Sequence, residues 1–150
     1  MLKSKRLQPV IKVAQNREDD AALVLNEYRK VIDQQEARLI ELRQYHAEYT
    51  QRLNDSGRNG LNIAQINDYR RFIARLAVAV KQQEAQLASC EVELKEKYDA
   101  WMLTRVRHQA LGKVVDRYQT QEHQQSEKRE QAESDERSQH MGRNRHTNIE

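Results

Sequence analysis

The sequence predicts an all-α fold, a long two-helix antiparallel coiled-coil hairpin with a flexible C-terminal tail. Hydrophobic residues make up 37% of the chain and charged residues 33%, which leaves too little apolar surface for a thick core. It is enough for the narrow seam between two helices, which needs about two apolar residues in seven. The single proline also favours long helices, because an interior proline breaks the helical hydrogen-bond ladder.

The first predicted helix covers residues 9–54. It begins at Pro9, whose missing N–H costs nothing in a first helical turn. Its apolar positions alternate steps of three and four, which indicates a left-handed coiled coil. The seam residues of this helix are Ile11, Ala14, Glu18, Ala21, Leu25, Tyr28, Ile32, Gln35, Leu39, Leu42, His46, Tyr49 and Leu53.

A cluster of helix-breaking residues at 54–61 predicts the loop of the hairpin. Gly57 and Gly60 permit positive φ, and the Asn, Asp and Ser side chains between them and before them form turn hydrogen bonds. A second helix starts at about residue 62, and its seam repeats the same spacing. Its seam residues are Ile66, Tyr69, Ile73, Leu76, Val80, Gln83, Leu87, Cys90, Leu94, Lys97, Trp101, Thr104, His108, Leu111, Val115 and Tyr118.

The two seams match chemically when the chain folds back at the loop. Apolar residues face apolar residues near the loop, as Leu53 faces Ile66. Gln35 faces Gln83, and a buried pair of amides satisfies itself while penalising other registers. Further from the loop the match is mixed, with Ile11 opposite His108, so a looser interface is expected there.

Both ends of the chain fall outside the predicted hairpin of residues 9–118. Residues 1–8 form a basic segment without the apolar region of a signal peptide. Residues 119–150 hold almost no large apolar side chain, so they cannot bury enough surface to offset the entropy of ordering. They are predicted to be a frayed helix that continues into a disordered polar tail. No stretch approaches the ~20 apolar residues of a membrane span.

The sequence lacks the motifs of an enzyme, a cofactor site or a metal site. The four glycines form no phosphate-binding loop. His46 and His108 fall on the seam, while His140 and His146 lie in the tail, so a metal site is not expected. Cys90, the single cysteine, lies on the seam as a small hydrophobe. We therefore expect a protein that is not an enzyme and that uses no cofactor, metal or small-molecule substrate.

Two aromatic residues next to the seam indicate a candidate protein-binding surface. Tyr45 precedes His46 and Phe72 precedes Ile73, which places both rings on one flank of the hairpin near the loop. Aromatic anchors beside an arginine are typical of binding hot spots. A simple widening of the hydrophobic seam is the other interpretation, and spacing alone does not separate the two. The flank comprises Arg38, Leu42, Tyr45, Tyr49, Phe72, Leu76 and Ala79.

A second candidate surface is basic. It consists of the run Asp68-Tyr69-Arg70-Arg71, with Arg105 and Arg107 further along the second helix. Scattered arginine pairs are typical of a solvated face, and contact with phosphates or nucleic acid is the alternative. The chain carries 26 basic and 23 acidic residues, a balance unlike the concentrated positive charge of a nucleic-acid binder. Nucleic acid is therefore not the expected partner.

Several residues on both sides of the loop carry a family resemblance. The most specific are the Tyr45 and Tyr49 pair before the loop and the run from Tyr69 to Phe72 and Ile73 after it. On these residues the chain resembles the flagellar FliJ family, the small coiled-coil component of the flagellar type III protein export apparatus, over roughly residues 10–118. The other matching residues are Glu18 to Ala22, Leu42, Glu48, Asn59, Gly60, Asn67 to Arg71, Trp101, Asp116 and Arg117.

The resemblance implies a job in protein export. Family members bind the cytoplasmic domain of the membrane export gate, enter the ring of the export ATPase as a stalk, and assist the cycling of export chaperones. It implies a cytoplasmic protein that is peripheral at the inner face of the cell membrane, which it reaches only through the gate. The equivalent stalk of an injection-type secretion system and a nucleic-acid-associated coiled coil are the alternatives.

The resemblance also implies which residues bind the gate. The gate-binding residues carry over to Leu42, Tyr45, Tyr49, Phe72, Leu76 and Ala79. Arg38 and Gln83 occupy positions where the family has other polar residues, so their roles do not carry over with the rest.

Overall fold

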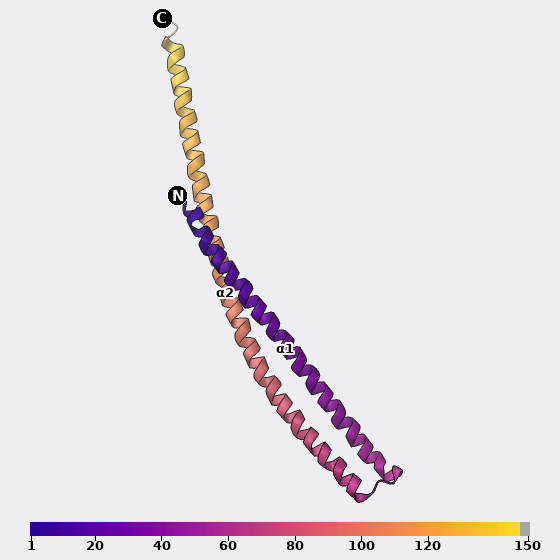
Figure 1. Ribbon diagram of the computed structural model, residues 1–150. Helices are drawn as coiled ribbons and strands as arrows, with labels where there is room; N and C mark the ends of the chain where they lie inside the picture. The colour runs from indigo at the N-terminus through magenta and orange to yellow at the C-terminus, as the bar shows by residue number, and fades with distance from the viewer. Residues whose placement is uncertain (148–150) are drawn as a thin grey trace. The chain divides into compact units, whose positions relative to one another are not determined.

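The computed structural model consists of two long helices that pack against each other. It describes residues 1–147, except for the side chains of residues 57–59. Helix α1 is Lys3–Asn59 and helix α2 is Ile63–Thr147. The two helices run in opposite directions from a short connection (Figure 1). The described residues contain no strand, and the predicted all-α two-helix fold is confirmed.

The helices form two compact units. One, the loop unit, is Asp19–Leu103 and contains the connection between α1 and α2. The other, the terminal unit, joins Met1–Glu18 to Thr104–Glu150.

The predicted seam forms the helix interface of the loop unit. Every predicted seam position in this unit is buried or half-buried, as the alternation of three and four requires. The least exposed apolar residues keep between 4% and 8% of their surface in contact with solvent. They are Leu25, Ile32, Leu39, Leu76 and Cys90.

A pair of glutamines crosses this interface as predicted. The Nε2 of Gln83 donates to the side-chain oxygen of Gln35 at 2.6 Å and to the Gln35 backbone carbonyl at 3.1 Å. Gln83 is buried, with 7% of its surface exposed. The amide is satisfied in this arrangement of α1 and α2, and a shifted register would leave it buried without these partners.

Two further polar contacts cross the loop unit. The hydroxyl of Tyr28 donates to the Glu93 carboxylate, and this hydrogen bond raises the pKa of Tyr28 far above its usual range. On the surface, Arg43 forms a 3.0 Å salt bridge with Glu84. Both partners of that bridge are about half exposed, so solvent screening keeps its contribution small.

The terminal unit is held by polar contacts at its seam. The Ser4 hydroxyl donates to Glu122 at 2.6 Å, and its backbone N–H donates to the same carboxylate at 3.2 Å. The Nδ1 of His108 lies 2.6 Å from the Glu18 carboxylate. Here the predicted pairing of Ile11 with His108 is replaced by Glu18 with His108. Side chains lean towards the N-terminus of their own helix, so those of α1 lean away from the loop and those of α2 lean towards it. Glu18 therefore meets a partner further from the loop than predicted, and His108 meets one nearer to it.

The start of α1 differs from the predicted one. The helix begins at Lys3 rather than at Pro9, which lies inside it. Tertiary contacts stabilise the added turns, because Ser4 bonds to Glu122 and the Lys3 ammonium lies 5.5 Å from the centre of the Tyr118 ring. The predicted basic segment of residues 1–8 is therefore largely helical.

The connection is also shorter than the predicted loop of residues 54–61. Helix α1 continues to Asn59, and Gly60 then adopts a φ of 72°, a conformation suited to glycine after a helix end. Asn62 caps α2, since its side chain accepts from the Gln65 N–H at 2.8 Å and the Gln65 side chain accepts from the Asn62 N–H at 3.2 Å.

The tail is helical rather than disordered as far as it is described. Helix α2 runs on to Thr147, and the side chains of residues 123–147 are exposed. Gln, Glu, Lys and Arg, which dominate this segment, are good helix formers. Figure 1 shows this part of α2 extending past the N-terminus without a partner helix. The remaining residues of the predicted tail, 148–150, lie outside the described residues.

Candidate protein-binding surface

The predicted surface lies in the loop unit, where α1 and α2 approach their connection. We call Leu42, Tyr45, Tyr49, Phe72, Leu76 and Ala79 the loop-end patch. The coiled-coil repeat of α1 places Tyr45 directly before a seam position, and that of α2 does the same for Phe72 and Ala79. The patch therefore combines seam residues with residues of one flank.

The patch residues differ in exposure. Tyr45 and Phe72 keep 44% and 40% of their surface exposed, which is high for large apolar rings. Leu42, Tyr49 and Ala79 are half-buried. Leu76 is buried, so it supports the patch from within the seam. Tyr45 and Phe72 are the two members that can offer most of a ring to a partner.

An aromatic cluster orients one side of the patch. The Phe72 ring meets the Tyr49 ring edge to face, with centroids 4.6 Å apart and planes at 67°. The Tyr69 ring lies 6.1 Å from that of Tyr49, and the Arg52 guanidinium stacks 4.9 Å from the Tyr49 centroid. Such ring pairs contribute roughly 0.5–1.5 kcal/mol beyond the burial of their area. Phe72 is thus fixed from α1 while its outer face stays open.

Two grooves border the patch. One, of about 390 Å³, is lined by Tyr49, Phe72 and their neighbours towards the connection. The other, of about 360 Å³, lies on the side away from the connection and is lined in part by Leu42 and Ala79. Grooves beside exposed rings provide the recesses into which a partner's side chains pack.

Arg38 and Gln83, the two positions to which the family's gate-binding role does not carry over, have different surroundings. Both line the second groove. Arg38 is exposed, so its guanidinium is available to a partner. Gln83 is buried and already bonded to Gln35, which makes it part of the seam.

Sequence reasoning missed three polar residues that line the first groove, Arg52, Gln65 and Asp68. Arg52 and Gln65 follow from the repeat, because they lie one heptad nearer the connection than Tyr45 and Phe72, respectively. That signal could have included them. Asp68 offers no such signal, since its heptad position usually faces solvent.

The side chains of the loop-end patch carry no group that would hold a metal ion in a cluster. Across residues 1–147, no cluster of three or more His, Cys, Asp or Glu side chains is arranged to hold a metal ion. Within that same part of the chain, neither helix has an apolar stretch of the length that crossing a membrane requires. The patch itself presents rings and aliphatic side chains, and the guanidinium groups of Arg38 and Arg52 lie in the grooves that border it. Such groups are suited to binding a partner by burial and by charge.

Comparisons with known proteins agree on one family. The family model of the flagellar FliJ protein matches residues 3–147. The flagellar FliJ protein of Salmonella typhi is 31% identical over 111 residues, which cover 74% of this chain and 76% of that protein. No solved structure matches the chain. A match that includes both helices together with their connection shows that the chain belongs to the flagellar FliJ family, whose members are associated with flagellar protein export.

Proposed function

We propose that the chain is a coiled-coil stalk and escort that links the export ATPase ring to the membrane export gate and assists the cycling of export chaperones. The loop-end patch is the gate-binding surface in this proposal. The observation that carries it is the exposure of Tyr45 and Phe72 on one flank, with Phe72 held in place by Tyr49.

The patch has the composition of a binding hot spot. Burying the exposed parts of two rings supplies apolar area, and aromatic residues are the usual anchors of protein interfaces. Arg38 and Arg52 border the rings and can pair with carboxylates of a partner. A gate segment that carries apolar side chains between acidic ones would fit this surface.

The proposed role is mechanical and requires no chemistry from the chain itself. Two helices locked in one register by Gln35 and Gln83 transmit a displacement better than two that slide. Contact with the gate would couple the ATPase, or the flow of protons, to export. In this proposal the chain acts in the cytoplasm at the inner face of the cell membrane.

Calorimetry with the cytoplasmic domain of the gate protein tests the patch. The double variant Tyr45→Ala/Phe72→Ala is expected to lose at least about 2 kcal/mol of binding free energy, since hot-spot truncations cost this much or more. Far-UV circular dichroism of the same samples should show unchanged helicity, because both rings are largely outside the seam.

A matched control removes exposed apolar side chains elsewhere in the loop unit. Tyr98 and Val92 are 40% and 63% exposed, and neither lies on the loop-end patch. Tyr98→Ala/Val92→Ala should bind the gate like the wild type. Equal loss in both double variants, or unfolding of the Phe72 variant, would make the patch a structural feature rather than a binding surface.

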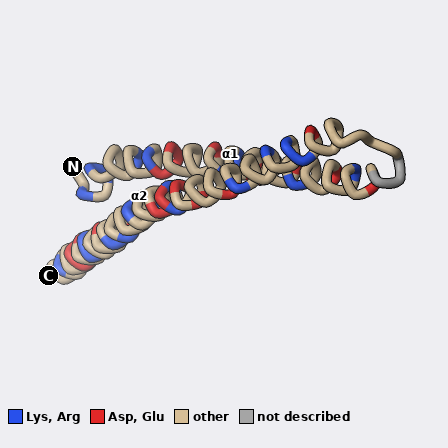
Figure 2. Tube along the Cα trace, turned by 90° about the horizontal axis from the view of Figure 1, so that it is seen from below, with Lys and Arg blue, Asp and Glu red and all other residues tan. Residues whose placement is uncertain are grey.

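Different observations bear on the two alternative functions, a stalk of an injection-type secretion system and a nucleic-acid-associated coiled coil. The family match is to a flagellar protein, which favours flagellar export over an injection-type system. For the nucleic-acid alternative, Figure 2 shows basic and acidic residues interspersed along both helices. A surface of mixed sign does not create the attraction for phosphates on which nucleic-acid binding depends.

A further inference from the structure

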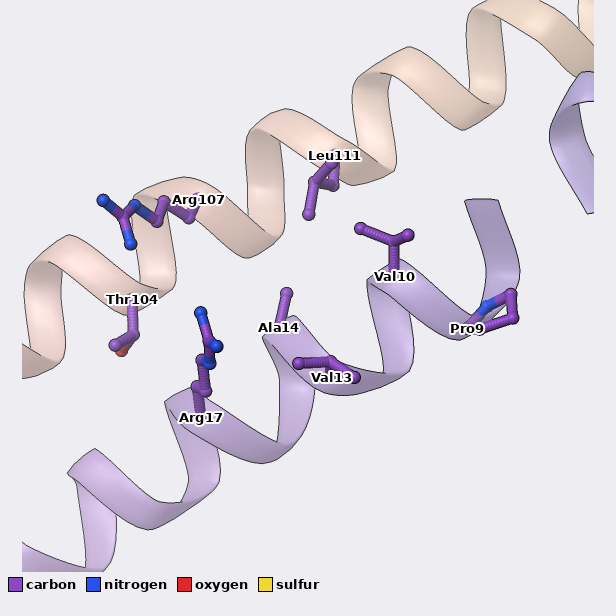
Figure 3. A pocket seen from close by; sticks show the side chains of 8 residues that line it. All are labelled: Pro9, Val10, Val13, Ala14, Arg17, Thr104, Arg107 and Leu111. Atoms are coloured by element: carbon purple, nitrogen blue, oxygen red, sulfur yellow. The ribbon is translucent and has the colours of Figure 1, made fainter. Parts of the chain in front are cut away.

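The terminal unit contains a groove that the loop-end patch does not use. It has a volume of about 440 Å³ and lies between the start of α1 and the part of α2 that packs against it. Figure 3 shows Val10, Ala14 and Leu111 directed into the space between the helices. Val10 and Val13 are 46% and 51% exposed, so the floor of this groove is open to solvent. We call it the arginine groove, for the reason given next.

Two arginines border the groove, one from each helix. Arg17 extends from α1 towards α2, on which Arg107 lies (Figure 3). Neither guanidinium has a salt bridge within the described residues. Glu18, the carboxylate next to Arg17 in the chain, is already bonded to His108. Arg107 has no acidic residue three or four positions away on its own helix, so its charge is not compensated locally.

The groove exists because a small residue occupies the seam. Ala14 stands where most seam positions carry a larger side chain, and it lines the groove together with Leu111 of α2. The residues that line this unfilled space lack the dispersion contacts that a larger side chain would make with them. An apolar side chain from another protein that entered the groove would supply them.

Floor and rim together specify one kind of occupant. We propose that the arginine groove is a docking site for an acidic amphipathic helix of another protein, which would pack as a third helix against α1 and α2. Its apolar residues would fill the floor beside Ala14, and its carboxylates would pair with Arg17 and Arg107. Helix-in-groove binding uses such a division between an apolar stripe and flanking charges, and arginine is suited to holding carboxylates in a fixed geometry.

The inference is independent of gate binding. The arginine groove belongs to the terminal unit, and the loop-end patch belongs to the loop unit. The Tyr45→Ala/Phe72→Ala variant should therefore bind a groove ligand like the wild type, so failure of one proposal leaves the other intact.

The test uses a synthetic helical peptide and the full-length chain. A peptide of about 18 residues, five turns at ~3.6 residues per turn, would carry leucine every third or fourth residue and glutamates on both sides of that stripe. With valine and leucine methyl groups labelled for NMR, we expect it to shift the methyl signals of Val10, Val13 and Leu111. Arg17→Glu/Arg107→Glu should weaken binding about tenfold or more.

A charge swap separates specific docking from general attraction. A second peptide with lysine in place of glutamate should prefer the Arg17→Glu/Arg107→Glu variant to the wild type by about tenfold or more. Arg70→Glu/Arg71→Glu makes the same change of net charge in the loop unit and should leave binding of the acidic peptide unchanged. Ala14→Met, which fills the floor without altering charge, should abolish it.

Several results would overturn the proposal. They are the absence of peptide binding, methyl shifts outside the groove, and equal binding of the acidic peptide by the wild type and the charge-reversed variant. Helicity measured by circular dichroism, together with retention of the Ser4–Glu122 contact, shows whether each variant remains folded. Binding of a short DNA duplex at physiological salt that is lost on Arg17→Glu/Arg107→Glu would assign the arginines to nucleic acid instead.

Discussion

Glu122 is the carboxylate that joins the first turn of α1 to α2 in the terminal unit. It accepts hydrogen bonds from the hydroxyl and the backbone N–H of Ser4. These bonds favour the ionised carboxylate, and that from the hydroxyl is the main cause that lowers the pKa of Glu122 below its ordinary value of 4.5. The charge of Glu122 thus contributes to the stability of the first turn of α1, together with the contact of Lys3 and Tyr118.

Acid should therefore loosen the start of α1. Because the pKa of Glu122 is lower in the folded chain, its stabilising effect is complete above pH 4.5 and is lost as the pH falls through the lowered value. An NMR titration of the Glu122 carboxyl carbon should show a midpoint below 4.5 in the wild type. Ser4→Ala should move it back towards 4.5, and an unchanged midpoint would mean that the hydrogen bond from the Ser4 hydroxyl is not formed in solution.

Individual residues of the candidate site were only partly predictable. Tyr45 and Phe72 stand next to seam positions in the sequence, and both are exposed in the structure. The ring that fixes Phe72 is that of Tyr49, which sits on the seam. Sequence spacing gives the face on which a residue lies, but ring orientations depend on rotamers chosen by neighbours on the other helix.

At the scale of the helices, the amide pair of Gln35 and Gln83 favours one register of α1 against α2 and lowers the free energy of unfolding relative to an apolar pair. Leucine at both positions would bury apolar surface instead of two amides. Gln35→Leu/Gln83→Leu should raise the free energy of unfolding by about 1 kcal/mol or more, measured by urea denaturation. Backbone amide NMR signals of the loop unit should broaden at the same time, as alternative registers become populated.

The single variant Gln83→Leu is the control for the double variant. Gln83→Leu alone leaves the Gln35 side chain without its partner and should lower stability by about 1 kcal/mol. A double variant that is less stable than this single one would show that the amides stabilise the seam rather than select its register.

The helices themselves were predictable to different degrees along their length. The seam followed from sequence at every position because steps of three and four admit one solution over many turns. The helix ends did not. Pro9 and the residues from 54 to 59 suggested breaks, yet contacts of Ser4 and Lys3 extend the start of α1. Within residues 1–147, only Gly60 adopts a positive φ. Local propensity is weak enough for such contacts to override it.

At the scale of the whole chain, the last part of α2 contributes little to the stability of the rest. The side chains of residues 123–147 are exposed, and the His123–Glu127 contact of 3.1 Å lies within one helix. Removal of residues 123–150 should leave the melting temperature within about 2 °C of the wild type, since exposed residues contribute little. Circular dichroism should detect a loss of helicity and the same main transition.

A longer truncation provides the contrast. Removal of residues 118–150 also deletes Glu122 and Tyr118, which contact Ser4 and Lys3. Its melting temperature should fall below that of the shorter truncation. Equal melting temperatures would show that the start of α1 is held by other contacts.

The tail was the part of the fold that the sequence predicted least well. A helix without a partner is marginally stable in water, so composition alone predicted disorder where the structure has helix.

The burial of Cys90 between α1 and α2 allows its reaction with a thiol reagent to report how often the two helices separate. Its thiol is 6% exposed in the seam and is the single sulfhydryl of the chain. A thiol reagent reacts when α1 and α2 separate around Cys90, so the labelling rate equals the rate of separation when the reagent reacts faster than the helices close again. A partner that holds α1 and α2 together should lower the labelling rate of Cys90, and one that separates them should raise it. The labelling rate of the unmodified protein therefore reports whether α1 and α2 stay together around Cys90.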